Sequence, residues 1–488
     1  MPNPIAPLKY IAGILLLFFA GLLQAQTNPL YTYQQLSDVF YAKQKDSIKK
    51  AWDCPEIYKT KATQKKYKEI WDSRTDFLTG AINDQNYVYE PEVFNYIQGI
   101  LDQLAHANPE QLPGKPFLMI DRSSSANAYA IGGNILAVNL GLIDFAQSRE
   151  EIAFVLAHEL SHNILNHVEN VMKERAEWLT SDDYKNTLNS VLDSKYERYS
   201  RLKKILEGYS FNRSKHQRYH ESDADSLAII LLKKTGMSFD AGFFLRLDSS
   251  DLQYKQPLKS PLKDYFTTYN LPFEDIWAQK RSKGLSTRNY NFRDTSGLED
   301  SLKTHPDCVE RYNKTKAQTD VTIKLTAIPP AIKTKATKML IWNIFDNMGL
   351  TACLYRVLLE KDKGNTDAWY DFMVHNIFTG LNYNDRQLQR FIAIGITPKE
   401  YISKDYYALQ NMLEQMPKES LSQYCTALQK ASFWSGMPVD AVGLKSLMYT
   451  LAIDPDISDK PKYNAARDFT ENNPASMYCE FANHFKKK

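Results

Sequence analysis

The stretch EEIAFVLAHELSHNILNH, residues 150–167, contains the pattern His-Glu-x-x-His inside an apolar sequence of helical period. On a helix, His158 and His162 are four residues apart and share a face, so both imidazoles can reach one cation, with Glu159 one position along. The helical pattern extends over residues 149–172. Because a catalytic zinc needs three protein ligands and an open position for water, the pattern predicts a metal-binding helix that still lacks one ligand.

His167 is the nearest candidate for the third ligand, but the sequence argues against it. One large class of zinc proteases has H-E-x-x-H-x-x-G-x-x-H, whereas this chain has Leu165 in place of the glycine and Val168 in place of the third histidine. On an uninterrupted helix, His167 would lie about 180° around the axis from His158. We therefore expect His167 to be a surface or packing residue.

A better candidate lies in RYHESDADSLA, residues 218–228. Glu221 and Asp225 are four residues apart on a second apolar helix, so Glu221 can complete the metal site while Asp225 accepts the outer N–H of a ligating imidazole. His220 and Asp223 fall on other faces of that helix, and we expect both to be polar surface residues.

Taken together, these motifs resemble the HtpX-like and CAAX-prenyl-protease family of gluzincin metallopeptidases, metallopeptidase family forty-eight, and most closely its soluble exported members. The resemblance covers about residues 90–315. It rests on four segments: NAYAIGGNILAVNLGLI (127–143), EEIAFVLAHELSHNILNH (150–167), ESDAD (221–225) and THPDCVER (304–311).

The resemblance implies a role for each matching residue. One Zn²⁺ per chain would be bound by His158, His162 and Glu221, and Glu159 would be the catalytic base that activates a zinc-bound water. A short strand would border the substrate cleft, where a substrate segment pairs by β-addition; its residues are Asn127, Ala128, Tyr129 and Ala130.

His305 is the remaining candidate for a catalytic role. Negative charge develops on the scissile carbonyl oxygen and needs a donor besides the metal. The family's Ser/Thr-His-Pro segment suggests His305 as that donor, with Arg311 as support. Three interpretations stay open for His305: a stabiliser of the transition state, a group that blocks the zinc, and an ordinary loop histidine before a proline.

Around these motifs the sequence predicts a mostly α-helical fold with a small β-sheet, an α+β zincin-type protease domain, followed by an α-helical C-terminal domain. Residues 91–108 have helical period and open with a proline, and the helix that carries Glu221 should close at Gly236. Three short strands are expected at residues 115–121, 127–131 and 134–140.

We expect four parts along the chain. They are a signal peptide (1–25), a helical N-terminal segment (26–88), the metallopeptidase domain (89–318) and the α-helical C-terminal domain (319–488). Residues 354–381 read as helix, turn, helix and resemble one degenerate tetratricopeptide-type unit, with an irregular helical domain as the alternative. The sequence from about residue 250 to 300, including GLSTRNYNFRDTSG (284–297), is irregular and polar and is expected to be an exposed loop.

The N-terminus and the cysteines indicate the compartment. Lys9, an apolar run over residues 11–23 and Gln24-Ala25 predict a cleaved signal peptide and export to the periplasm or beyond, with an uncleaved anchor as the alternative. The five cysteines include no C-x-x-C, which argues against a thiolate zinc site. Buried free cysteines and a single disulfide both stay open.

These observations favour an exported zinc metalloendopeptidase that hydrolyses peptide bonds in extended or misfolded polypeptides, including misassembled envelope proteins. The alternative is a chaperone-like protein with a latent or structural zinc site, in which the C-terminal helical domain binds clients or protein partners. A net charge of +3 from 60 basic and 57 acidic residues gives no case for nucleic acid. Because no apolar span is expected after residue 25, a membrane-bound prenyl-protein protease is disfavoured.

Overall fold

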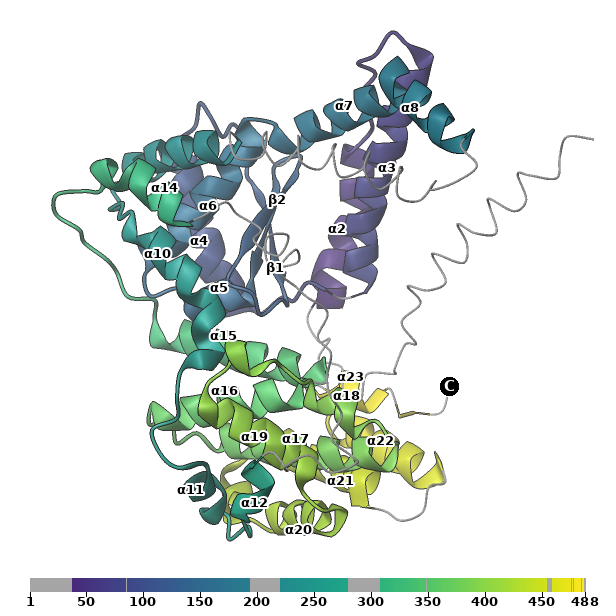
Figure 1. Ribbon diagram of the computed structural model, residues 1–488, viewed down its shortest axis with the longest axis vertical. Helices are drawn as coiled ribbons and strands as arrows, with labels where there is room; N and C mark the ends of the chain where they lie inside the picture. The colour runs from purple at the N-terminus through teal and green to yellow at the C-terminus, as the bar shows by residue number, and fades with distance from the viewer. Residues whose placement is uncertain are drawn as a thin grey trace, which may run out of the picture.

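The computed structural model describes residues 37–193, 220–279, 308–453 and 459–486, except positions 85, 348, 475, 477 and 484. These residues form two bodies, one above the other in Figure 1: the upper holds a small sheet covered by helices, and the lower is built from helices. The predicted fold class is therefore confirmed. The predicted signal peptide, the polar stretch 284–297 and His305 lie outside the described residues.

The sheet contains the three predicted strands, β1 (Phe117–Asp121), β2 (Ala128–Gly132) and β3 (Ile135–Asn139), in the order β1-β3-β2. β3 runs parallel to β1 and antiparallel to β2, so β2 lies at the edge. The turn between β2 and β3 needs glycine, because Gly132 and Gly133 have φ angles of +94° and +56°. A side chain at Gly133 would also collide with the indole of Trp52.

The helix α6 (Arg149–Ile164) forms the centre of the upper body, and all of its residues from Glu150 to Ser161 are buried. Its first turn is capped by Ser148, whose Oγ accepts the N–H of Glu151 at 3.2 Å. It packs against β2, β3 and α4 (Pro91–Ala107), the helix predicted at residues 91–108.

The prediction of one helix over residues 149–172 is wrong at its C-terminal end. α6 stops at Ile164, Asn166 takes a left-handed conformation with φ of +54°, and α7 (His167–Thr180) starts afresh. Asparagine tolerates this conformation better than most residues, because its short polar side chain bonds locally. The break therefore has a local cause.

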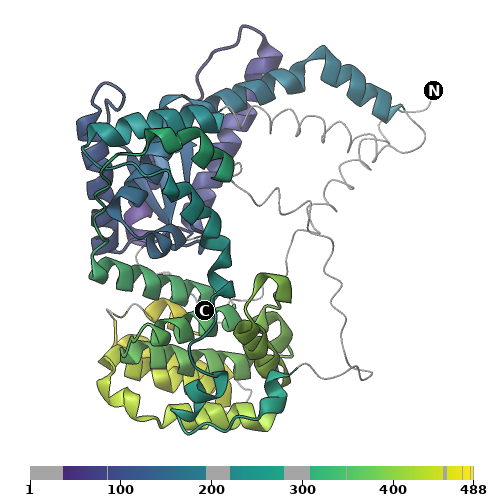
Figure 2. The ribbon, with the colours of Figure 1, turned by 60° about the vertical axis from the view of Figure 1, so that its left-hand side comes forward.

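Further helices surround this centre. Residues 220–234 are helical and are followed by Gly236 with φ of +80°, as predicted. α10 (Gly242–Asp248) packs against α14 (Cys308–Thr315). The N-terminal helices α2 (Ser37–Ala51) and α3 (Lys61–Asn83) pack together, and α3 also packs against α7, which leads into α8 (Asp182–Leu192) (Figures 1 and 2).

The lower body is organised around α17, which packs against α16, α20 and α21. Its helices are α15 (Pro330–Asp346), α16 (Leu350–Asp362), α17 (Ala368–Arg386), α18 (Arg390–Ile394), α19 (Lys404–Gln415), α20 (Lys418–Gln429), α21 (Val439–Ile453), α22 (Asp459–Asn472) and α23 (Cys479–Asn483). The predicted helix, turn, helix at residues 354–381 is confirmed as α16 and α17. No disulfide is formed among the described cysteines, and Cys353 and Cys425 are buried.

Two features cross the expected domain boundary at residue 319, which stays a prediction. The expectation of an exposed loop from about residue 250 is wrong for the described residues up to 279. There the short helices α11 (Leu262–Thr267) and α12 (Asp275–Ala278) belong to the lower core, through Phe266 and Trp277. In addition, α15 contributes Ile332 to the upper core and Trp342 to the lower one.

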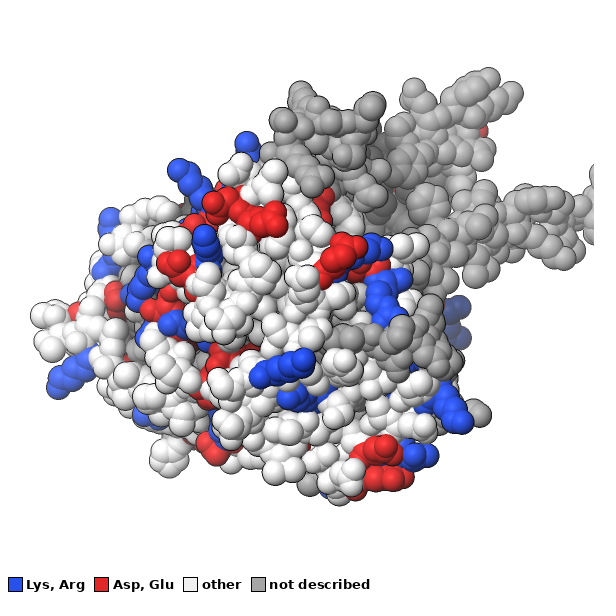
Figure 3. All heavy atoms as spheres, turned by 90° about the horizontal axis from the view of Figure 1, so that it is seen from below, with Lys and Arg blue, Asp and Glu red and all other residues white. Residues whose placement is uncertain are grey.

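Charged side chains of both signs are mixed on the lower face of the molecule. Seen from below, where the lower body faces the viewer, acidic and basic side chains are interspersed over the face (Figure 3). None of the described helices combines the length and the apolar character that crossing a bilayer requires.

A buried ion pair joins the two bodies. Arg356 of α16 contacts the carboxylate of Asp144, at the end of α5 (Leu140–Phe145), at 2.5 Å, and both side chains are about nine-tenths buried. Thr337 of α15 donates its hydroxyl to the same carboxylate. Burial raises the pKa of Asp144, but the charge of Arg356 lowers it by a larger amount. The pKa of this carboxyl group therefore lies below its usual range.

Removing one partner of this pair should destabilise the fold. We expect Asp144→Ala to lower the free energy of unfolding by about 3–5 kcal/mol, because it leaves the guanidinium of Arg356 buried without a counter-charge. Denaturant titration measures the change. The control is Asp72→Ala, which breaks an exposed pair with Lys68 and should cost less than about 1 kcal/mol. Equal losses in the two variants would contradict the prediction.

Candidate metal centre

Three side chains from two helices converge beside the edge of the sheet. The Nε2 atoms of His158 and His162 lie 3.1 Å apart, and the carboxylate of Glu221 lies 3.3 Å from the first and 3.5 Å from the second. One ligand atom from each residue falls within 4.8 Å of the others. The structure therefore brings together the three residues that the sequence nominates as metal ligands.

The hydrogen bonds around His158 are those that a metal ligand requires. Its Nδ1 lies 2.9 Å from Asp225 Oδ1, and a carboxylate can only accept there, so Nδ1 carries the hydrogen. In the neutral imidazole, Nε2 then directs its lone pair at His162 and Glu221. Such a cluster of lone pairs repels itself unless it shares a cation. Two imidazoles with one carboxylate is a donor set that holds catalytic zinc, so the residues fit the metal.

The neighbours of His158 shift its pKa. Burial and the charge of Arg311 lower the pKa of His158, but hydrogen bonds to Asp225 and Glu221 raise it more, to about 9. Binding of a metal to this ring at neutral pH must therefore displace a proton.

A buried arginine holds Asp225 in place. Arg311 of α14 donates to both carboxylate oxygens of Asp225, from Nε at 2.9 Å and from Nη2 at 2.5 Å, and its guanidinium lies 4.5 Å from the centre of the Phe244 ring. Burial raises the pKa of Asp225, but the charge of Arg311 and its hydrogen bonds lower it by a larger amount, so the pKa lies below the usual value. The described contacts of Arg311 are with Asp225 and His158, and its expected support of His305 stays a prediction, because His305 lies outside the described residues.

Glu159 follows His158 on α6 and is hydrogen-bonded to the edge strand. It is 3% exposed, and its Oε2 accepts the backbone N–H of Ala130 at 2.8 Å. Asn139 N–H donates to the carbonyl of Asn127, so Tyr129, two residues on, also turns its backbone towards β3. The intervening Ala128 and Ala130 direct their backbone groups away from β3, towards the outer edge.

The four residues predicted to border the cleft thus differ in their contacts. Ala128 is buried, Asn127 and Ala130 are half-buried, and Tyr129 directs its hydroxyl to Asp121 at 2.6 Å, away from Glu159. The backbone of β2, rather than these side chains, lies next to the candidate ligands.

The expectation that His167 is a packing residue is confirmed, but the break in the helix places it beside His162 instead of on the opposite side. Its Nδ1 is 2.8 Å from Nδ1 of His162, and its ring stacks on that of His220, with centroids 4.2 Å apart. Burial and the nearby His220 lower the pKa of His167 to about 4. His220 is half-buried rather than a surface residue, whereas Asp223 is exposed as expected. Asn166, which breaks the helix, is the signal that could have revealed this contact.

Metal binding should release a proton from His158. Because its pKa is about 9 without metal, the ring is protonated at pH 7, and a ligating Nε2 must lose that proton. We expect about one proton released per zinc bound at pH 7, falling towards zero as the pH rises above 9. Titration calorimetry in buffers of different ionisation enthalpy counts these protons. A count near zero at pH 7 would argue against this assignment.

The contact between Asp225 and His158 gives a second prediction. We expect Asp225→Asn to weaken zinc affinity by about 10–100-fold, because the amide cannot hold the imidazole in the ligating orientation as the carboxylate does. Competition with a chelator of known affinity measures the change. Asp223→Asn is the matched control on the same helix, since Asp223 is exposed, and its affinity should be that of the unaltered chain.

The part of the chain that carries these residues is similar to known proteases. Residues 91–319 match the family described as Peptidase family M48. Over 201 residues, 40% of each chain, the sequence is 29% identical to a putative beta-barrel assembly-enhancing protease of Vibrio cholerae. It is 28% identical over 187 residues to the beta-barrel assembly-enhancing protease of Yersinia pestis, covering 36% of this chain and 38% of that one.

A third relative is Metalloprotease YcaL of Escherichia coli, 34% identical over 154 residues, which are 31% of this chain and 59% of that protein. The chain therefore spans about two fifths of the length of the first two relatives and 59% of the third, less than two thirds in each case. The family resemblance predicted from the motifs is confirmed.

Proposed function

Residues 91–319 of the chain belong to peptidase family M48, and we propose that the protein is an exported zinc metalloendopeptidase that cuts extended or misfolded polypeptides. One observation carries this proposal: His158, His162 and Glu221 converge within 4.8 Å, and Glu159, next to His158 on α6, holds a buried carboxylate that accepts a hydrogen bond from the edge strand. A structural metal site has no use for that extra carboxylate.

The proposed chemistry divides between the metal and the protein. His158, His162 and Glu221 would hold zinc, which supplies a Lewis acid and makes a water acidic enough to attack at neutral pH. Glu159 accepts the proton of the attacking water and delivers it to the leaving nitrogen. The hydrogen bond from Ala130 N–H orients that carboxylate. His305 stays a proposal as the donor to the developing oxyanion or as a group that blocks the site.

The edge strand suggests the class of substrate. The outward N–H and C=O groups of Ala128 are suited to pair with an extended chain, whereas the N–H of Ala130 already donates to Glu159. Main-chain hydrogen bonds depend little on substrate sequence. Unfolded or misassembled polypeptides supply such segments. The names of two relatives refer to β-barrel assembly, which supports misassembled envelope proteins as substrates. With the predicted signal peptide, this favours the periplasm or the exterior.

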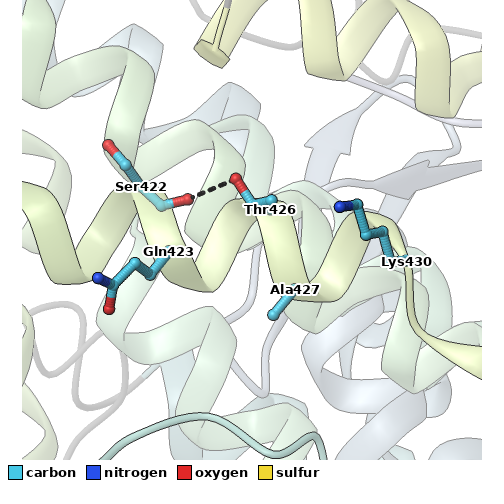
Figure 4. A pocket seen from close by; sticks show the side chains of 5 residues that line it. All are labelled: Ser422, Gln423, Thr426, Ala427 and Lys430. Carbon is cyan, nitrogen blue, oxygen red and sulfur yellow. Dashed lines mark hydrogen bonds between the residues drawn. The ribbon is translucent and has the colours of Figure 1, made fainter.

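The alternative is a chaperone-like protein whose C-terminal helices, residues 319–488, hold a client. An unfolded client needs apolar surface. The hollow on α20 has a volume of about 410 Å³, but Ser422, Gln423, Thr426, Ala427 and Lys430, which line it, are small or polar (Figure 4). This hollow gives no support to client binding, and proteolysis is the better proposal.

The decisive test is Glu159→Gln in the chain from residue 26 onward. We expect the unaltered chain to cut casein and the variant to lose at least about 100-fold in rate while keeping about one bound zinc, since the amide cannot accept the proton. Glu174→Gln, an exposed glutamate of α7, is the matched control and should cut normally. Cleavage by Glu159→Gln at the normal rate, or cleavage that survives zinc removal, would refute the proposal.

A further inference from the structure

A pocket of about 510 Å³ opens directly beside the candidate metal ligands. His162 and Glu221 line one end of it, and α3 and α7 supply the walls. The volume lies within the range of roughly 300–1,000 Å³ typical of ligand pockets. Because the pocket shares residues with the proposed catalytic centre, its occupant would lie next to the bond that is cut.

The walls of this pocket combine apolar and basic side chains. α3 and α7 contribute the apolar residues Ile70, Phe77, Val168, Val171 and Met172 and the basic residues Arg74 and Arg175. Phe77 is 72% exposed, so its ring is accessible at the wall. The charge of Arg74 is paired with Glu169, and Glu221 belongs to the proposed metal site. The apolar side chains therefore favour a large apolar group as the occupant.

α3 lies outside residues 91–319, yet it is firmly attached to the upper body. The guanidinium of Arg74 lies between Trp52 and Trp71, 4.0 and 4.2 Å from their ring centres, and pairs with Glu169 of α7 at 3.2 Å. Glu169 also accepts the N–H of Gly133, in the turn after β2. One buried network therefore fixes α3, α7 and the edge strand relative to one another.

We propose that α3 and α7 form a specificity pocket that receives one large apolar side chain of the polypeptide substrate, such as Phe or Leu, beside the scissile bond. This inference rests on the proposed peptidase function and adds a residue preference to it. Backbone pairing along β2 would accept many sequences, and the pocket would select the cleavage site among them.

The test uses the chain from residue 26 onward and peptides that differ at one position, Phe, Leu, Ala or Asp, in an otherwise Gly/Ser-rich sequence. Mass spectrometry locates the cut, and kcat/KM is measured for each peptide. We expect kcat/KM for the Phe peptide to exceed that for the Ala peptide by about 10-fold or more. Phe77→Ala removes part of the wall and Val171→Trp fills the pocket, and each should lower this ratio several-fold.

Val439→Ala is the matched control, because Val439 is an 82% exposed apolar residue of the lower body. A Phe-to-Ala ratio near one in the unaltered chain, or a ratio that neither pocket variant changes, would overturn the inference and leave the peptidase proposal standing. If no peptide is cut, the pocket is tested by measuring the binding of the same peptides to the Glu159→Gln chain. Tighter binding of the Phe peptide, lost on adding Phe77→Ala, supports the pocket, and equal binding of all peptides rejects it.

Discussion

The hydrogen bond between Asp225 and the Nδ1 of His158 is the constraint on which the rest of the candidate site depends. It fixes the tautomer and the orientation of one ligand, and it does so inside a helix that is buried on nearly every side. Arg311 compensates the buried charge of Asp225, and the helix α14 brings that arginine to within 2.9 Å. Three segments far apart in the sequence must therefore pack correctly before the lone pairs of His158, His162 and Glu221 converge.

The sequence was most informative where function restricts local spacing. His158 and His162 share a helix face by periodicity, and Glu221 and Asp225 repeat the same interval on a second apolar helix, so their convergence could be expected without coordinates. The three strands were likewise predictable, because Gly132 and Gly133 permit the positive φ angles of the tight turn between β2 and β3.

Other contacts could not be derived from local patterns. The place of His167 depends on one left-handed residue, Asn166, which periodicity does not register. The wall formed by α3 depends on the packing of residues nearly a hundred positions apart, such as Arg74 and Glu169. The short helices at residues 262–278 looked irregular and polar in sequence, because their few apolar residues pack against a core that is completed much later in the chain.

The helix α15 has a thermodynamic consequence. Its first turns bury Ile332 and Ala336 with the sheet-containing core, and its last turns bury Leu340 and Trp342 with the helical core. Because both cores share this helix, unfolding of one core exposes apolar surface of the other. The two bodies therefore behave as one cooperative unit, and the region that carries the metal ligands owes part of its free energy of folding to helices that never approach them.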